Sequence, residues 1–91
     1  MKHLDLTIKG RVQRVGFRFS AMEAAYRYSI RGVVMNSGDS DVMIEAEGTP
    51  ENLDKFLAWC KKGPIGARVE NVHIGEGQLK DYQSFEIVSR T

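Results

Sequence analysis

The chain lacks the features that mark secreted, membrane-spanning and strongly charged proteins. It has one cysteine, Cys60, which excludes an internal disulfide and any metal site made of several cysteines. It has no long apolar run, so we expect neither a signal peptide nor a membrane span, and we expect a cytoplasmic protein. Repeats and low-complexity segments are absent too. The formal net charge of +1 is low for a general nucleic-acid binder, so we expect no nucleic-acid partner.

What is present fits one small globular domain. A length of 91 residues allows a single core, and 42% apolar with 27% charged residues is an ordinary composition for a globular protein. We therefore expect one domain over residues 1–91. No exposed apolar repeat is evident, so we expect a monomer. Cys60 follows Trp59 on an apolar helical stripe, which favours a packing role over a reactive thiol.

The spacing of apolar residues predicts alternating strands and helices. In chain order we expect a strand over 4–9, a helix over 17–30, a hairpin of strands over 33–37 and 42–47, a helix over 50–62, a strand over 69–74 and a short strand over 85–88. Thr49 and Pro50 are typical of a helix start, and Gly63 with Pro64 is typical of a helix end. In the first helix the expected buried stripe is Phe19, Met22, Tyr26 and Ile30, beside a line of small residues at Ala21 and Ala25.

The order β-α-β-β-α-β with a short extra strand predicts an α+β fold. Both helices would cover one face of a mostly antiparallel sheet, in a two-layer ferredoxin-like sandwich. A right-handed crossover makes the first two strands parallel, so their C-terminal ends lie together. This topology is expected to bring Asn36, near the end of the second strand, close to Arg18.

A basic loop follows the first strand. Four basic side chains fall within ten residues without an intervening acid, and they are Lys9, Arg11, Arg14 and Arg18. The loop leads into a helix, whose first backbone N–H groups lack partners within the helix and favour an anion. Backbone donors, the helix dipole and arginine would then act on one ligand. The segment therefore predicts a phosphate site.

The residues of this loop and of the following strand resemble those of the acylphosphatase family. Further matches lie in the C-terminal half, so the resemblance covers nearly the whole chain. The matching motifs are Gly10-x-Val12-Gln13-x-Val15-x-Phe17-Arg18, Gly32-x-Val34-x-Asn36, Phe56-Leu57-x-Trp59-Cys60, Gly63-Pro64, Ala67-x-Val69 and Phe85-Glu86-Ile87-Val88.

The resemblance implies hydrolysis of an acyl phosphate to a carboxylate and inorganic phosphate, without a cofactor or metal. Arg18 would bind two phosphate oxygens, and Asn36 would orient the attacking water. The leaving carboxylate has a pKa of about 4, so its departure needs no general acid. On position alone, Arg18 would be a surface charge and Asn36 a residue closing a local hydrogen bond. The expected phosphate-binding loop consists of Gln13, Arg14, Val15, Gly16, Phe17 and Arg18.

Arg14 departs from the family pattern, which has glycine at this place. Glycine reaches positive φ freely, whereas arginine in the left-handed region costs on the order of 1 kcal/mol. Three outcomes follow. Arg14 adopts an ordinary φ, its guanidinium adds a contact to the acyl part or the phosphate, or the loop is distorted and activity is weak.

Two other functions fit parts of the sequence. A phosphate-binding regulatory module would keep this fold and lose turnover. A single-stranded RNA reader would share the element order, and Gly16-Phe17-Arg18-Phe19 is similar to an aromatic RNA-binding motif. We expect Phe17 and Phe19 to be hydrophobic anchors instead, since the predicted outer sheet face is acidic. We expect His3 and His73 to be surface or packing residues, because neither has a second ligand at metal spacing.

Overall fold

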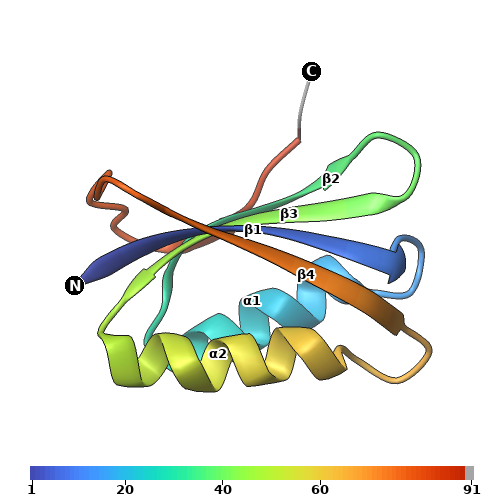
Figure 1. Cartoon of the computed structure of the whole chain (residues 1–91), viewed down its shortest axis with the longest axis horizontal. Helices are drawn as coiled ribbons and strands as arrows, with labels where there is room; N and C mark the ends of the chain where they lie inside the picture. Colours follow the sequence, from blue (N-terminus) through green and yellow to red (C-terminus); the bar gives the residue numbers. More distant parts are fainter. Residues whose placement is uncertain (90–91) are drawn as a thin grey trace.

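The chain forms a five-stranded sheet with two helices on one face (Figure 1). The computed structural model describes residues 1–89. The predicted order of elements is confirmed. The elements are β1 (Lys2–Arg11), α1 (Phe17–Arg27), β2 (Arg31–Ser37), β3 (Asp41–Gly48), α2 (Pro50–Lys62), β4 (Arg68–Gly77) and β5 (Phe85–Ile87).

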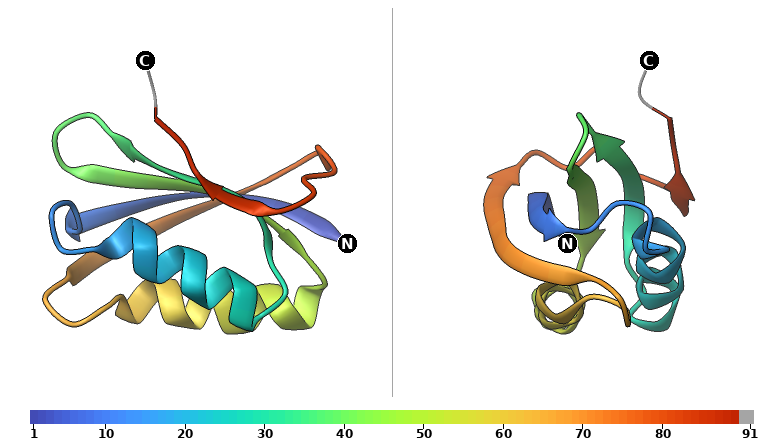
Figure 2. Two further views of the ribbon diagram at one scale, coloured as in Figure 1. Left: turned by 180° about the vertical axis from the view of Figure 1, so that it is seen from behind. Right: turned by 90° about the vertical axis from the view of Figure 1, so that its right-hand side faces the viewer.

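The sheet places the ends of β1 and β2 at the same edge. Its strand order is β4-β1-β3-β2-β5. Both β1 and β2 pair antiparallel with β3, so they run in the same direction on either side of it. Only β5 pairs parallel with its neighbour, which is β2. The predicted mostly antiparallel ferredoxin-like sandwich is therefore confirmed, and Figure 2 shows its two layers from the side and from the end.

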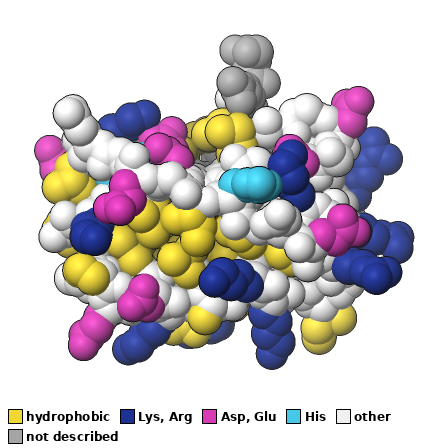
Figure 3. Space-filling view, in the orientation of Figure 1, with side chains coloured by type: hydrophobic (Ala, Val, Ile, Leu, Met, Phe, Trp, Pro, Cys, Tyr) yellow, Lys and Arg dark blue, Asp and Glu magenta, His cyan; other side chains and the backbone are white. Residues whose placement is uncertain are grey.

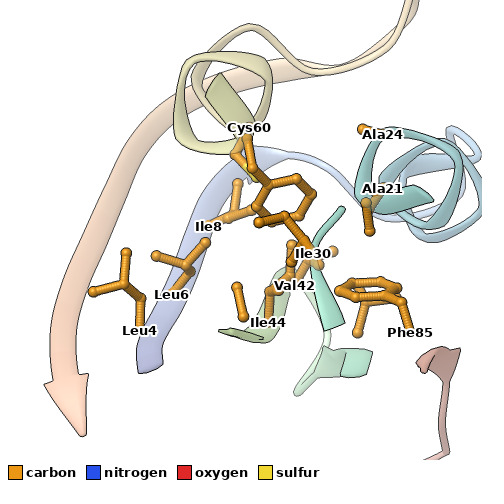
Figure 4. Close-up of a cluster of buried hydrophobic side chains, with 14 of the residues drawn as sticks. Leu4, Leu6, Ile8, Ala21, Ala24, Ile30, Val42, Ile44, Cys60 and Phe85 are labelled. Atoms are coloured by element: carbon orange, nitrogen blue, oxygen red, sulfur yellow. The ribbon is translucent and has the colours of Figure 1, made fainter. Parts of the chain in front are cut away.

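The core lies between the sheet and the helices because β1 and β3 are paired so that their apolar side chains share the face that the helices cover. Leu6 is opposite Ile44, and Ile8 is opposite Val42. These side chains are at most 1% exposed and face the helices (Figure 4). Burying one such side chain is favourable by roughly 1.5–3 kcal/mol, so the register of the two strands is strongly fixed.

Helix α2 begins and ends where its capping residues predict. The Thr49 hydroxyl accepts a hydrogen bond from the Asn52 N–H at 3.2 Å, and Pro50 occupies the first turn. Gly63 follows the last turn with φ 71°. Cys60 is fully buried on the helix face toward the sheet, as expected, and burial raises the pKa of its thiol. Within residues 1–89, no helix is long and apolar enough to cross a bilayer.

The structure corrects the predicted buried face of α1. The helix packs its small residues against the sheet, and its buried residues are Phe17, Ala21, Ala24 and Ala25. Phe19 is 68% exposed and Tyr26 63% exposed, so the expected stripe is wrong at these two residues, as is the expected anchoring role of Phe19. The reason is that alanines allow the helix backbone to approach the sheet closely, and this leaves the bulkier aromatic positions on the outside. The burial of Ile30 and of the predicted line of small residues at Ala21 and Ala25 is confirmed.

Three elements also end two or three residues away from their predicted ends. Helix α1 ends at Arg27 and not at residue 30, because Ser29 adopts φ 57°. Strand β1 continues past Gly10, where a change of register against β4 marks a bulge that glycine accommodates at φ 129°. Strand β4 extends to Gly77, since it pairs with β1 as far as His3.

The helix-free face of the sheet carries a buried ionic network centred on Glu47. The Glu47 carboxylate is 2% exposed and accepts a hydrogen bond from His3 Nδ1 at 2.6 Å. It also accepts the backbone N–H groups of Lys80 at 2.7 Å and Tyr82 at 3.1 Å. These bonds attach the segment between β4 and β5 to the sheet. His3 is therefore a packing residue, in agreement with one of its two expected roles.

Replacing Glu47 by glutamine is expected to lower the free energy of unfolding by about 3 kcal/mol, since it leaves buried donors without their charged acceptor. The matched control is Glu76→Gln, which removes an exposed ion pair with Lys2 at 3.7 Å. That change should stay within about 0.5 kcal/mol. Urea unfolding measures both, and equal small effects would contradict a structural role for the network.

The network also predicts how stability depends on pH. Burial alone would raise the pKa of Glu47, but the Lys80, His3 and Tyr82 hydrogen bonds outweigh it and lower the pKa below 4.5. Burial alone would lower the pKa of His3, but hydrogen bonds to Glu47 and Asp5 raise it above 6.5.

The contribution of Glu47 is therefore present above pH 4.5 and lost as pH falls through its folded-state pKa. The contribution of His3 is present below pH 6.5 and lost as pH rises through its folded-state pKa. The free energy of unfolding should be highest between these values. Glu47→Gln should remove the acidic slope and weaken the slope of His3, which keeps its hydrogen bond to Asp5. An acidic slope that persists in this variant would assign the pH dependence to other groups.

Candidate functional site

The candidate site lies at the sheet edge where β1 and β2 end. The loop 12–16 connects β1 to the N-terminus of α1, and Asn36 is the penultimate residue of β2. Ile8, Val42 and Asn36 form one row across β1, β3 and β2. Side chains in one row share a face, so Asn36 lies on the helix side of the sheet. The topology thus brings the two predicted catalytic residues, Arg18 and Asn36, to one pocket.

Buried side chains at both ends hold the loop in place. Val12 and Phe17 are each 1% exposed, and the Phe17 ring packs edge-on against Trp59 with ring centres 5.4 Å apart. In the middle, the Gln13 amide donates to the carbonyl oxygens of Asp41 at 2.8 Å and Gly38 at 3.2 Å. Gln13 therefore braces the loop against the β2–β3 turn, and its side chain is not free for a ligand.

The loop backbone is arranged to receive an anion. Arg14 has φ 62° and Gly16 has φ 74°, so two residues of the loop adopt the left-handed region. In the described part of the chain, no backbone N–H from residue 13 to residue 19 donates to a protein acceptor, and the first intrahelical bond runs from Ser20 N–H to the Gly16 carbonyl. Successive free N–H groups in such a turn form an anion-binding concavity, here at the positive end of a helix.

Arg18 presents an uncommitted guanidinium in the first turn of α1. Among residues 1–89 its side chain has no ion pair and no hydrogen bond, which fits both a solvated surface charge and a group that is free to bind an anion. Lys9 differs, because its ammonium donates to the Asp41 carboxylate at 2.8 Å and thereby lowers the pKa of that carboxyl. The Lys9 ammonium is thus paired with Asp41, so Lys9 does not belong to the group of basic side chains that could bind an anion. Figure 3 shows that several lysine and arginine side chains gather on the right, at the edge of the molecule where β1 ends.

Asn36 carries the clearest sign of an absent ligand. Its Oδ1 atom is buried and has no hydrogen-bond partner, the one buried side-chain polar atom of this kind among the described residues. A buried acceptor without a partner typically costs about 1–3 kcal/mol. Asn36 therefore does not close the local hydrogen bond that its position alone suggests, and its carbonyl oxygen has no donor from the protein.

Arg18 and Asn36 line the same pocket, whose volume is about 350 Å³. The pocket is mixed in character, with two guanidinium groups, one amide and an apolar wall. None of its lining residues is acidic, so nothing in it opposes an anion. The lining residues are Val12, Arg14, Gly16, Phe17, Arg18, Phe19, Asn36 and Ile87.

Arg14 lines this pocket in a strained backbone conformation. Its φ of 62° excludes the outcome in which arginine takes an ordinary φ. A non-glycine residue in the left-handed region costs on the order of 1 kcal/mol. The side chain is exposed and has no protein partner within the described residues. The loop is nonetheless well anchored by Val12 and Phe17, and its free N–H groups remain available.

The pocket offers no metal ligands of the usual kinds, since histidine, cysteine and carboxylates are missing from its lining. Elsewhere in the described residues one group has metal-ligand spacing, with donor atoms of His3, Asp5 and Glu45 within 4.8 Å of one another. Cations of the protein already engage these carboxylates. His3 Nε2 bonds to Asp5 at 2.9 Å, and the Lys80 ammonium lies 2.7 Å from Glu45. This group therefore belongs to the stabilising network.

Two residues that line the pocket, Phe19 and Ile87, were not predicted from the sequence. The Phe19 side chain lies outside the core and lines the pocket. Ile87 of β5 lines the pocket as well. Phe19 could have been recognised from its position two residues after the buried Phe17, which places it on another face of the helix. No signal in the sequence locates Ile87, because the pairing of β5 with β2 joins residues some fifty positions apart.

Comparisons with known proteins agree with this geometry. A sequence model of the family described as Acylphosphatase matches residues 4–87. An acylphosphatase from Listeria welshimeri is 44% identical over 85 residues, which cover 91% of each chain. The comparison thus spans the loop, β2 and the C-terminal half.

Solved structures share the fold over nearly the full length. The crystal structure of acylphosphatase from Bacillus subtilis aligns with a TM-score of 0.94 and 32% identity, covering 97% of this chain and 99% of that chain. The structure of an acylphosphatase from Coxiella burnetii aligns with a TM-score of 0.92 and 31% identity, covering 96% of this chain and 92% of that chain.

Proposed function

Since the chain belongs to the acylphosphatase family and hydrolyses acyl phosphates, we propose that Arg18 and the loop backbone bind the phosphate while Asn36 orients the attacking water. One observation carries this proposal. The buried Asn36 Oδ1 has no protein partner, and Asn36 lines the same pocket as Arg18. A structural role would give this atom a protein donor, whereas a hydrolytic role leaves it for water.

Phosphate binding would use three kinds of donor. The N–H groups of residues 13–19 have no protein acceptor and lie at the helix N-terminus, which favours negative charge. The Arg18 guanidinium offers a planar fork that can bind two phosphate oxygens at once. The backbone donors are held in place before the substrate arrives, so they need little reorganisation as charge develops on the phosphoryl group.

The hydrolytic step would be an in-line displacement at phosphorus. Asn36 Oδ1 accepts one O–H of the water and so directs its lone pair toward phosphorus. The water oxygen forms a bond to phosphorus as the bond from phosphorus to the acyl oxygen breaks. The electron pair leaves with the carboxylate, whose low pKa makes protonation unnecessary, and the water protons pass to the phosphate product and the solvent.

The donor set supports chemistry without a metal. Arginine and backbone N–H groups already neutralise the phosphate, and the pocket lining contains no ligand of the kind that divalent cations prefer. Turnover is therefore expected to be unchanged by a chelator.

Hydrolysis in ¹⁸O-labelled water tests the proposed direction of attack. With benzoyl phosphate as substrate, the label is expected in inorganic phosphate, since Asn36 would place water behind phosphorus. Unlabelled water and a buffer blank without protein serve as controls, because slow spontaneous hydrolysis contributes its own pattern. Label found mainly in benzoate would mean attack at the carbonyl carbon, and the assigned roles would then be wrong.

We also infer that the 91 residues act as one monomeric domain in the cytoplasm. The described residues share one hydrophobic core, and the single cysteine is buried and unpaired, which suits a reducing compartment. Sedimentation at micromolar concentration should give a mass near 10.3 kDa. A stable dimer mass would refute the monomer.

A further inference from the structure

Arg14 is the feature of the pocket that phosphate binding does not use. The loop donors and Arg18 are the groups proposed to bind the phosphate, and Arg14 is a second arginine that lines the same pocket. It is exposed, and no acid or carbonyl of residues 1–89 engages it. The Arg14 backbone has φ 62°, a conformation that glycine would adopt without strain. Such a residue at the mouth of a binding site points to a ligand contact.

The pocket has room for more than a phosphate. Its volume of about 350 Å³ would hold about ten water molecules, whereas a phosphate group has five non-hydrogen atoms. The remaining lining is apolar, with Val12, Phe19 and Ile87 as its main side chains. The acyl part of the substrate would lie against this wall. Phe19 contributes a largely exposed ring at 68%, which suits contact with a flat or aromatic acyl group.

The charges around Arg14 favour a second anion. The pocket contains two guanidinium groups and no carboxylate. Arg14 also borders a neighbouring hollow that includes Arg11 and Asp39, but it forms no ion pair with Asp39. A neutral acyl group would leave the Arg14 charge without a partner, while a carboxylate or phosphate on the acyl group would provide one.

We propose that Arg14 binds an anionic substituent on the acyl part, so that this protein prefers acyl phosphates that carry a second negative group. The proposal rests on the assignment of the phosphate to the loop and Arg18. It names Arg14 as a specificity-determining residue, and the contact would act on substrate capture more than on the chemical step.

With rigid aromatic substrates, the charge of the acyl part can be varied while its shape stays the same. The probes are 3- and 4-carboxybenzoyl phosphate and their carbamoyl counterparts. The carbamoyl group has nearly the same shape as the carboxylate but carries no charge. For at least one ring position, the kcat/KM ratio of carboxy to carbamoyl substrate should be about fivefold, in line with an exposed ion pair, and should fall as salt is added. A comparison of ratios cancels any effect that a variant has on the loop or on phosphate binding.

Three variants isolate the role of Arg14. In Arg14→Gln, which removes the charge but keeps a polar side chain, and in Arg14→Gly, which also removes the strain, the ratio should fall to about one. In Arg14→Lys, which keeps the charge, most of the preference should remain. Arg11→Gln is the matched control, because Arg11 is equally exposed but does not line the pocket, and its ratio should equal that of the wild type.

A wild-type ratio near one for both ring positions would overturn the proposal, as would an unchanged ratio in Arg14→Gln. An equal loss in Arg11→Gln would also overturn it, since the effect would then come from the general surface charge. These failures differ from failure of the proposed site. Undiminished hydrolysis of the neutral probes by Arg18→Ala would contradict that site, whatever the ratios show.

Discussion

Arg18→Ala is expected to lower kcat/KM by at least about a thousandfold and to weaken binding of inorganic phosphate in parallel. Loss of one preorganised donor at a site of developing charge raises the barrier by roughly 3–4 kcal/mol. Arg18→Ala also removes one of the two arginines that line the pocket, so we expect the upper end of this range or more. The fold should survive, because Arg18 makes no hydrogen bond or ion pair with the rest of the described chain. Steady-state kinetics with benzoyl phosphate and calorimetric titration with phosphate measure the two effects.

Arg18→Lys is the control for charge. Lysine keeps the positive charge but lacks the planar fork, so it should restore part of the phosphate affinity and little of the turnover. Urea unfolding of both variants should match the wild type within about 0.5 kcal/mol. Near-normal turnover and phosphate affinity in Arg18→Ala would remove Arg18 from the site.

Asn36→Ala should separate turnover from binding. We expect kcat to fall by at least about a hundredfold, since the water loses its acceptor, while phosphate affinity stays within a few-fold. Stability provides a second readout. Because Asn36 Oδ1 is buried without a protein partner, its removal should leave the free energy of unfolding unchanged or raise it by up to about 1 kcal/mol.

Ser37→Ala, at the next position of β2, is the matched control for a change at this strand end, because Ser37 does not line the pocket. It should leave both kcat and phosphate affinity close to wild type. Parallel losses of kcat and phosphate affinity in Asn36→Ala, or marked destabilisation, would show that Asn36 supports the loop and does not handle water.

Much of the fold was predictable because its signals are local. The alternation of Leu4, Leu6 and Ile8 identifies a half-buried strand, and the side chains at 49 and 50 fix the start of α2. The site was predictable for a different reason. A crossover of known hand forces two strand ends together, so Asn36 could be placed near Arg18 without knowing any contact.

The remaining features depend on contacts between distant residues. Helix α1 has apolar residues on two faces, and only packing on the sheet decides that the alanine face is buried and Phe19 is not. The bond between His3 and Glu47 joins residues 44 positions apart, and it forms because the β1–β3 register places them opposite each other. The strain at Arg14 likewise depends on how both loop ends are anchored, which the sequence of the loop alone does not reveal.

The most direct test of the phosphate site is a titration of ¹⁵N-labelled protein with inorganic phosphate, followed by backbone amide shifts. The largest shifts should fall on residues 13–19, whose N–H groups have no protein acceptor, and they should follow one saturable isotherm. The same shifts should persist in Asn36→Ala and be strongly reduced in Arg18→Ala. Shifts that map mainly to β4 or to the helix-free face, with the loop unaffected, would contradict the account.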